Sequence, residues 1–464
     1  MDQTDLCFRS ASELATLILA GEATSEQVTQ ACLDRIEEVN GRLNAVVTLA
    51  PDALDRAREA DAELRRGDHR GPLHGVPFTL KDSIDTAGLV TTAGTAGWRH
   101  RVPERDATVA ARLRAAGGIL LGKTNTPELT WSNETDNDVY GATNNPYDLA
   151  RTPGGSSGGP AAAVAAGCSP FDIGSDTGDS IRQPAHVCGI AGLKPTSGRV
   201  PRTGHNPGSA GLLERLTQLG PMARSVADIA LVLPVIAGPD GEDPHIVPAP
   251  LGDPTRVRIE GLRVAFFTTN GVRTPTPEIQ AAVVAAGQAL AAAGALVENV
   301  MPPDLPALGS VYDQLVGADG YSWLQRLITG AGTPGMGSYE TRPWFVAGRP
   351  LAGDDLSELI EHVDTLRSRM LRWLTDNRVD LVVSPALPLP AVLHGEGLSP
   401  EFGDTYSDVH NITGWPSLVV RGGTAPGGLP IGVQIAAGPW REDVALAGGA
   451  VIEAASGGWV RPPL

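Results

Sequence analysis

The chain has 464 residues, of which 42% are hydrophobic, enough to form a large core. Its length suggests about two or three domains, although large α/β enzymes often form a single one. Its formal charge is −17 and it has no basic run, which argues against nucleic acid or an anionic membrane surface as the main partner.

Cysteine usage and apolar stretches bear on the compartment. The four cysteines form no CxxC pair and have no metal-like spacing with histidine, which favours free thiols in a reducing compartment and predicts no metal site. The acidic first residues lack the basic start of a signal peptide. The most apolar stretch, 281–297, contains Gln288 and is typical of a buried helix followed by a strand, not of a membrane span. We therefore expect a cytoplasmic protein that is not inserted in a membrane.

The first part of the chain is predicted to be helical. Ser10-x-x-Glu13 and Thr24-x-x-Gln27 are capping-box patterns, in which two side chains satisfy the free N–H groups at a helix start. Each pattern precedes apolar residues at helical spacing. Residues 1–70 are therefore expected to be mostly helical.

Strands are predicted to alternate with helices after residue 70. The apolar run 76–80 predicts a short buried strand that carries Lys81 at its end. A helical pattern that includes Val109 and Leu113 is followed by the apolar run 119–121, which predicts the next strand. Alternation of this kind predicts an α/β fold with a mostly parallel sheet. Later strands are expected at 262–267, 296–300, 381–383, 417–420 and 431–435.

Two glycine- and serine-rich stretches lie in the middle of the chain, at 154–159 and 174–182, joined by an alanine-rich helix. Glycine lets backbone N–H groups come close to a ligand. A serine among such groups can attack a carbonyl, and the N–H groups can hold the resulting oxyanion. Serine alone is a weak nucleophile and needs a base, for which Lys81 is the candidate.

Taken together, three blocks resemble the amidase signature hydrolases. Residues 73–82 resemble the lysine block of that family, 154–159 its glycine–serine block, and 176–182 its nucleophile block. The resemblance extends through 220–226, 411–416 and 429–434, and is weakest between about 242 and 380. The resemblance implies one domain over 1–464 and a large mixed sheet with helices on both faces. The domain would comprise a helical part (1–70), a signature core (71–235) and the rest of the sheet (236–464).

The resemblance also implies a catalytic triad and an acyl-enzyme, with no cofactor and no metal. Ser180 would be the nucleophile, Ser156 would follow a cis peptide bond and relay the proton, and Lys81 would be the neutral base. Burial beside apolar residues suits this base, because it disfavours the charged form. The oxyanion hole would be formed by the backbone of Thr177, Gly178, Asp179 and Ser180, and the supporting residues would be Ser157, Asp176 and Arg182.

Asp179 departs from the family, which usually has glycine just before the nucleophile. Its backbone must either have an ordinary negative φ or adopt a strained left-handed conformation. Its carboxylate also brings negative charge near a developing oxyanion. Asp176 and Arg182 are expected to hold this loop as a pair.

The family acts on many C–N substrates, and three observations favour neutral aryl or alkyl amides, with esters and carbamates (urethanes) as further substrates. Trp131 and Asn133 fall in the segment that lines the substrate channel of relatives, and Gly155 is a third expected contact. The glycine- and proline-rich segment 330–350 carries three aromatic residues and is typical of a lid or binding loop. Asp179 disfavours acidic substrates. A monomer or homodimer is expected.

Other functions remain open at this point. The A subunit of a glutamine-dependent tRNA amidotransferase is the alternative within the family. A Ser–His–Asp esterase is the alternative of another class, because Gly154-x-Ser156-x-Gly158 matches the nucleophile elbow. Residues 117–124 match the P-loop pattern, but their middle positions look like a strand, and Pro127 follows where a helix should begin.

Overall fold

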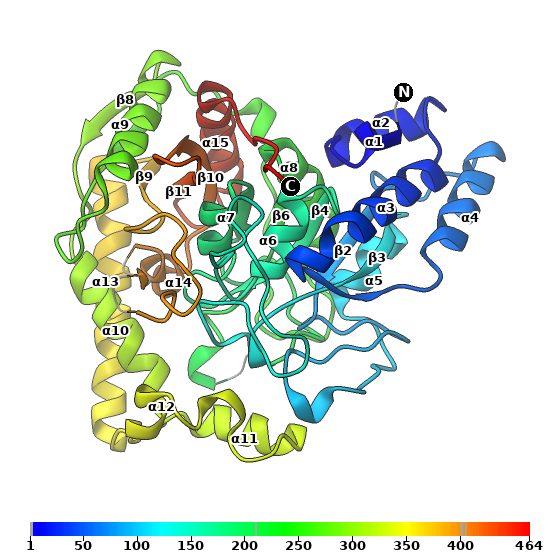
Figure 1. Cartoon of the computed structure of the whole chain (residues 1–464). Helices are drawn as coiled ribbons and strands as arrows, with labels where there is room; N and C mark the ends of the chain where they lie inside the picture. Colours follow the sequence, from blue (N-terminus) through cyan, green and yellow to red (C-terminus); the bar gives the residue numbers. More distant parts are fainter. Residues whose placement is uncertain (1–2, 209–210, 400–401, 404–405) are drawn as a thin grey trace.

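The computed structural model describes residues 3–208, 211–399, 402–403 and 406–464. Its N-terminal part is helical apart from one strand, β1 (Val46–Leu49), and lies at one side of the molecule (Figure 1). Both capping boxes are present, and each supplies reciprocal hydrogen bonds at a helix start. The helices of this part are α1 (Gln3–Leu6), α2 (Ala11–Leu19), α3 (Ser25–Leu43) and α4 (Ala53–Arg65).

A single sheet of eleven strands runs through the molecule in the order β1-β3-β2-β4-β6-β5-β10-β11-β9-β7-β8. Every strand predicted from the sequence is present, with ends shifted by a few residues. The strands after β1 are β2 (Pro77–Lys81), β3 (Ile119–Thr124), β4 (Phe171–Asp176), β5 (Ala191–Lys194), β6 (Gln218–Ala223), β7 (Arg263–Phe266), β8 (Leu296–Asn299), β9 (Leu381–Pro385), β10 (Ser417–Thr424) and β11 (Pro430–Ala437).

The α/β class and the large mixed sheet are confirmed, but the expectation of a mostly parallel sheet is wrong. Only β3-β2-β4 and β9-β7-β8 pair in parallel. The other six pairings are antiparallel. The tight connection between β10 and β11 illustrates the reason, because a short loop can join only antiparallel strands.

Helices cover both faces of the sheet (Figure 1). Consecutive side chains of a strand point to opposite faces. Val420 accordingly packs in the core beneath α8 (Val226–Ile236), while Val419 packs with α6 (Gly158–Ala165) and α7 (Arg182–Cys188). The remaining helices near the sheet are α5 (Thr108–Ala115), α9 (Pro277–Ala292) and α15 (Glu442–Ser456).

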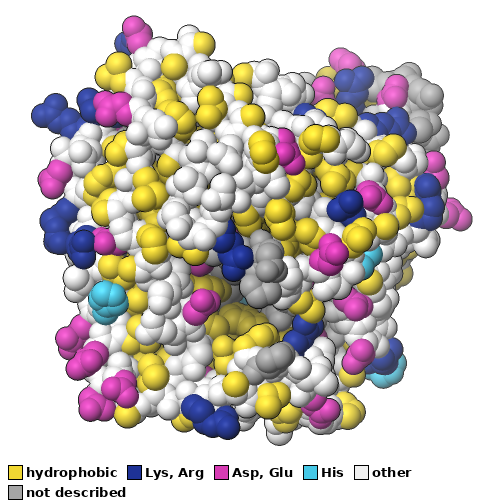
Figure 2. Space-filling view, turned by 60° about the vertical axis from the view of Figure 1, so that its left-hand side comes forward, with side chains coloured by type: hydrophobic (Ala, Val, Ile, Leu, Met, Phe, Trp, Pro, Cys, Tyr) yellow, Lys and Arg dark blue, Asp and Glu magenta, His cyan; other side chains and the backbone are white. Residues whose placement is uncertain are grey.

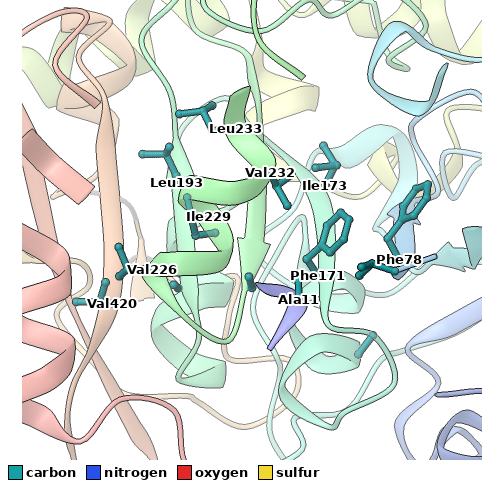
Figure 3. Close-up of a cluster of buried hydrophobic side chains, with 14 of the residues drawn as sticks. Ala11, Phe78, Phe171, Ile173, Leu193, Val226, Ile229, Val232, Leu233 and Val420 are labelled. Carbon is teal, nitrogen blue, oxygen red and sulfur yellow. The ribbon is translucent and has the colours of Figure 1, made fainter. Parts of the chain in front are cut away.

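Aromatic packing joins the two strands that matter most for the site. The rings of Phe78 on β2 and Phe171 on β4 stack with their centroids 5.6 Å apart. Ile173 and residues of α8 lie beside them in the core (Figure 3). Because β2 and β4 are parallel, their carboxyl ends open at the same edge of the sheet. The residues that follow both strands therefore meet there.

A second core lies beyond this edge, between α10 (Leu305–Gly317), α13 (Gly353–Asn377) and α14 (Asp408–Thr413). The segment 330–350 is not wholly irregular. It begins at the end of α11 (Ser322–Ala331) and contains the short helix α12 (Pro343–Ala347). In the part of the chain that the structure describes, no helix is long and apolar enough to cross a membrane.

Candidate active site

Lys81 is the last residue of β2 and is fully buried. Its Nζ lies 2.6 Å from Ser156 Oγ, 2.9 Å from Ser157 Oγ and 3.0 Å from Ser175 Oγ. The structure therefore brings Lys81 and Ser156 together from segments 75 residues apart. It also adds Ser175 of β4, which the sequence analysis did not single out.

The surroundings of Lys81 favour its neutral form. Burial lowers the pKa of its ammonium well below its usual range, against the opposing influence of Asp176, Asp172 and Asp179. All three groups within hydrogen-bond distance are neutral hydroxyls. A neutral amine at this position can accept a proton from Ser156.

The peptide bond between Gly155 and Ser156 is cis, as expected. Gly155 is required for packing, because a Cβ there would lie 2.4 Å from the carbonyl oxygen of Ser132. Its N–H donates to the Gln183 side chain at 2.8 Å, so this N–H is not available to a substrate. Gly155 therefore has a packing role, and the substrate contact expected of this residue stays a prediction that its N–H cannot serve.

Ser180 lies in the loop between β4 and α7, and is half-buried. Its carbonyl accepts a hydrogen bond of 3.1 Å from the N–H of Ser157, which ties this loop to the one that carries Ser156. Among the described residues its hydroxyl has no hydrogen-bond partner, so the contact with Ser156 that a relay needs is not formed in this structure. Catalytic hydrogen bonds are often completed only when substrate binds.

The backbone of the same loop is suited to holding an anion. The N–H groups of Thr177, Gly178 and Ser180 donate to no described residue. Asp179 is buried, and its φ is not positive, so the residue that replaces the usual glycine causes no left-handed strain. The oxyanion loop therefore keeps an ordinary backbone despite this departure.

Asp176 and Arg182 hold the loop as a buried pair, as the sequence predicts. Arg182 donates to both carboxylate oxygens of Asp176, at 3.0 and 2.8 Å, and to the carbonyl of Gly178 at 2.6 Å. Although burial alone would raise it, the charge of Arg182 lowers the pKa of Asp176 to about 2. Asp176 also accepts a bond from the N–H of Ile181, which fixes the turn into α7.

A pocket of about 540 Å³ opens above Ser180. Trp131 and Asn133 line it, as expected, together with Arg342 and Trp344 from segment 330–350. Figure 2 shows one face of the molecule hollowed below its centre, with hydrophobic side chains on the floor. Further lining residues come from α10 and from the residue before α11, and carry no signal in the sequence, namely Tyr312, Asp313, Val316 and Tyr321.

The two rival motifs do not have the structures that their chemistry needs. Residues 119–124 of the P-loop match are strand β3, with Lys123 fully buried. Ser156 lies against Lys81, and among the described residues no histidine hydrogen-bonds Ser156 or Ser180. His186, for example, is occupied by the backbone of Gly432 and Leu389.

Comparisons with known proteins agree with this geometry. The family model described as Amidase matches residues 27–446. The A subunit of the glutamyl-tRNA(Gln) amidotransferase of Chloroflexus aggregans is 38% identical over 96% of this chain and 95% of its own length, and that of Salinispora arenicola is 36% identical over 99% and 100%. Among solved structures, 6-aminohexanoate cyclic dimer hydrolase has a TM-score of 0.87 at 30% identity, covering 98% of this chain and 99% of its own. A peptide amidase has a TM-score of 0.85 at 31% identity, covering 98% and 99%.

Proposed function

This chain belongs to the amidase signature family of C–N hydrolases, and from that premise we propose that it cleaves amides through an acyl-enzyme on Ser180. The observation that carries the proposal is the distance of 2.6 Å between Lys81 Nζ and Ser156 Oγ in a fully buried setting. A buried amine whose neighbours are hydroxyls is a base that serine chemistry can use.

The reaction proceeds in two halves. The Ser180 oxygen attacks the amide carbonyl while its proton passes to Ser156, whose own proton passes to Lys81. The oxyanion is held by the backbone N–H groups of the loop 177–180. When the C–N bond breaks, Lys81 returns the proton through Ser156 to the leaving nitrogen. Water then attacks the ester by the same relay and releases the acid and Ser180.

Neutral aryl or alkyl amides are the first candidate substrates, with esters and carbamates as further ones. Support comes from the pocket, where Trp131, Tyr312, Tyr321 and Trp344 offer aromatic surface beside Ser180. Aromatic side chains bury a large apolar area, so their contact with an apolar group of the substrate stabilises binding. Asp179 is buried next to Ser180, which disfavours substrates with an anion near the carbonyl.

Glutamine is the second candidate, with this chain acting as an amidotransferase A subunit. It has the stronger support from relatives, because those with this name are 36–38% identical over almost the whole chain. The pocket also offers Arg342 and Asp313, whose charges are opposite to the carboxylate and ammonium of a free amino acid. In that case tRNA and a partner protein enter the reaction, in place of the expected independence from nucleic acid.

Two experiments test these proposals. A serine-directed fluorophosphonate should label Ser180 in the wild type and fail to label Ser180→Ala, and unchanged labelling of the variant would refute the assigned nucleophile. A panel of anilides, short amides, aryl carbamates and glutamine then separates the candidates. If glutamine is the substrate, Arg342→Met should lower the hydrolysis of glutamine and leave that of the neutral amides unchanged. A wild type that is active on glutamine and on no other member of the panel would reject the neutral-amide candidate.

A further inference from the structure

A second cavity, of about 310 Å³, adjoins the pocket above Ser180. The two share three lining residues, Thr130, Trp131 and Thr177, so they meet at these side chains. Each also has a tryptophan of its own, Trp323 in the second cavity and Trp344 in the first. Trp323 packs edge-on against Trp131, with ring centroids 5.1 Å apart. Space for a substrate therefore extends beyond the pocket above Ser180, as an amide with two substituents would need.

His205 lines the second cavity and has an unusual environment. It is only 4% exposed, yet neither ring nitrogen hydrogen-bonds any described residue. The carbonyl of Pro207 favours a raised pKa of the His205 ring, but it does not form a hydrogen bond with either ring nitrogen. Burial lowers the pKa of His205 to about 3, so the ring is neutral at ordinary pH. A neutral imidazole has one donor and one acceptor to offer a ligand.

The backbone ties His205 to the side of the site that carries the base. The backbone of His205 forms an isolated antiparallel β-bridge with that of Ile84. The N–H of the next residue, Asn206, donates to the Ser83 carbonyl at 2.6 Å. Ser83 and Ile84 follow Lys81 closely in the chain. The leaving nitrogen takes its proton from Lys81 through Ser156, so the leaving arm of a substrate turns toward this side. The acyl group of the substrate then lies in the pocket above Ser180.

We propose that the second cavity binds the leaving amine and that His205 is a specificity residue that hydrogen-bonds a neutral polar group on that amine. The inference rests on the proposed amide hydrolysis. The walls contributed by Trp131, Pro207, Leu213, Trp323 and Leu327 suit an apolar body. Arg326 also lines the cavity, and its charge disfavours a cationic end group on the amine. The substrate class is therefore a secondary amide whose amine has an aryl or alkyl body ending in a neutral hydrogen-bonding group, such as a carboxamide.

Three amides with the same acyl group test the role of His205: the primary amide, the anilide and the 4-carbamoylanilide. His205→Phe keeps a ring and removes both nitrogens. It should lower the ratio of kcat/KM for the carbamoylanilide to that for the plain anilide by about tenfold, the worth of one lost hydrogen bond. His205→Gln, which keeps a donor and an acceptor, should retain part of the preference. An unchanged ratio in His205→Phe would overturn the proposal.

The two unshared tryptophans provide a matched pair of variants that does not depend on His205. Trp323→Ala should lower the ratio of kcat/KM for the anilide to that for the primary amide. It should leave unchanged the ratio of kcat/KM for a primary amide with a long acyl group to that for one with a short acyl group. Trp344→Ala should do the reverse. Variants that both alter the same ratio would overturn the assignment of the cavities. If the wild type cleaves none of the three amides, the proposed hydrolysis of neutral amides fails and not merely the subsite.

Discussion

Two buried lysines occupy neighbouring strands, and their environments differ. Leu80 pairs with Lys123 and Lys81 with Thr124, so the two lysines are almost level in the sheet. Lys123 donates to the backbone carbonyl of Ile84 and, at 2.9 Å, to Thr86 Oγ1. Burial lowers the pKa of Lys123 to about 8, with Asp82 opposing the shift. Among the described residues Lys81 donates hydrogen bonds only to serine hydroxyls, and burial lowers its pKa well below its usual range.

Burial alone therefore does not distinguish a base from a structural cation. A carbonyl and a nearby carboxylate favour a charged ammonium, whereas serine hydroxyls can also donate to a neutral amine. Lys81 is thus suited to taking a proton, and Lys123 to holding the segment that follows β2. The chain has only three lysines, and the third, Lys194, is also fully buried.

The largest expected effect separates the two lysines by activity. Lys81→Met should lower kcat on the order of 10⁴-fold or more, as for members of other catalytic triads, because Ser156 loses its proton acceptor. Ser156→Ala and Ser180→Ala should lose similar amounts, and the losses should not add in double variants. Lys123→Met is the matched control and should retain most of the activity. Equal losses in Lys81→Met and Lys123→Met would remove the distinction.

The pH dependence follows from the lowered pKa of Lys81. The base must be neutral, so kcat/KM should rise about tenfold per pH unit below the apparent pKa of the coupled site and then level off. The plateau should be reached below the pKa of a free lysine, about 10.4. Lys123→Met should show the same profile. Full wild-type activity sustained at pH 5 would argue against a lysine base.

Stability should rank the same two variants in the opposite order. Lys123→Met leaves the Ile84 carbonyl and Asp82 without their buried cation and should lose about 1–3 kcal/mol of unfolding free energy. Lys81→Met removes a lysine whose burial opposes its charge, so it should be neutral or stabilising. Urea unfolding measures both, and a larger loss in Lys81→Met would contradict the comparison.

The sign of the pH effect on stability can also be checked. Between the folded pKa of Lys81 and about 10.4, the unfolded chain binds more protons, so the cost of burying Lys81 falls as pH rises. The gain from Lys81→Met over the wild type should therefore be largest at low pH and vanish near the pKa of free lysine. A gain that grows with pH would contradict a lowered pKa.

The smallest effect concerns Ser175, the third hydroxyl near Lys81. Ser175→Ala removes one hydrogen-bond partner of a positioned base and should lower kcat by roughly tenfold or less. Ser169→Ala is a buried-serine control, because the Ser169 hydroxyl donates only to the Phe171 carbonyl, at the other end of β4. A complete loss in Ser175→Ala would make Ser175, and not Ser156, the first proton acceptor.

How much could be predicted from the sequence differs between the parts of the site. Lys81, Ser156, Asp176 and Arg182 lie in short blocks whose residue types state their chemistry, and the structure brings them together as predicted. Ser175 was missed because serine in a strand carries no such signal. The hydrogen bond that occupies the Gly155 N–H could not be foreseen, because its partner, Gln183, lies 28 residues away and in no recognised pattern.

The fold shows the same limit. Individual strands are local features, and apolar runs such as 119–121 and 431–435 located them correctly. Strand pairing depends on long-range contacts, so the antiparallel half of the sheet could not be deduced from alternating strands and helices. The pocket walls likewise come from separate helices, and nothing in the segments containing Tyr312 or Trp323 indicates that they face Trp131.

The central claim is that Lys81 is neutral where Lys123 is charged. Lysine-selective ¹³C and ¹⁵N labelling should give only three side-chain signals, which Lys81→Met and Lys123→Met would assign. An NMR titration should show Lys81 losing its proton at a lower pH than Lys123, and remaining neutral across the pH range of full activity. A Lys81 that titrates at or above the pH at which Lys123 titrates would contradict its role as the base.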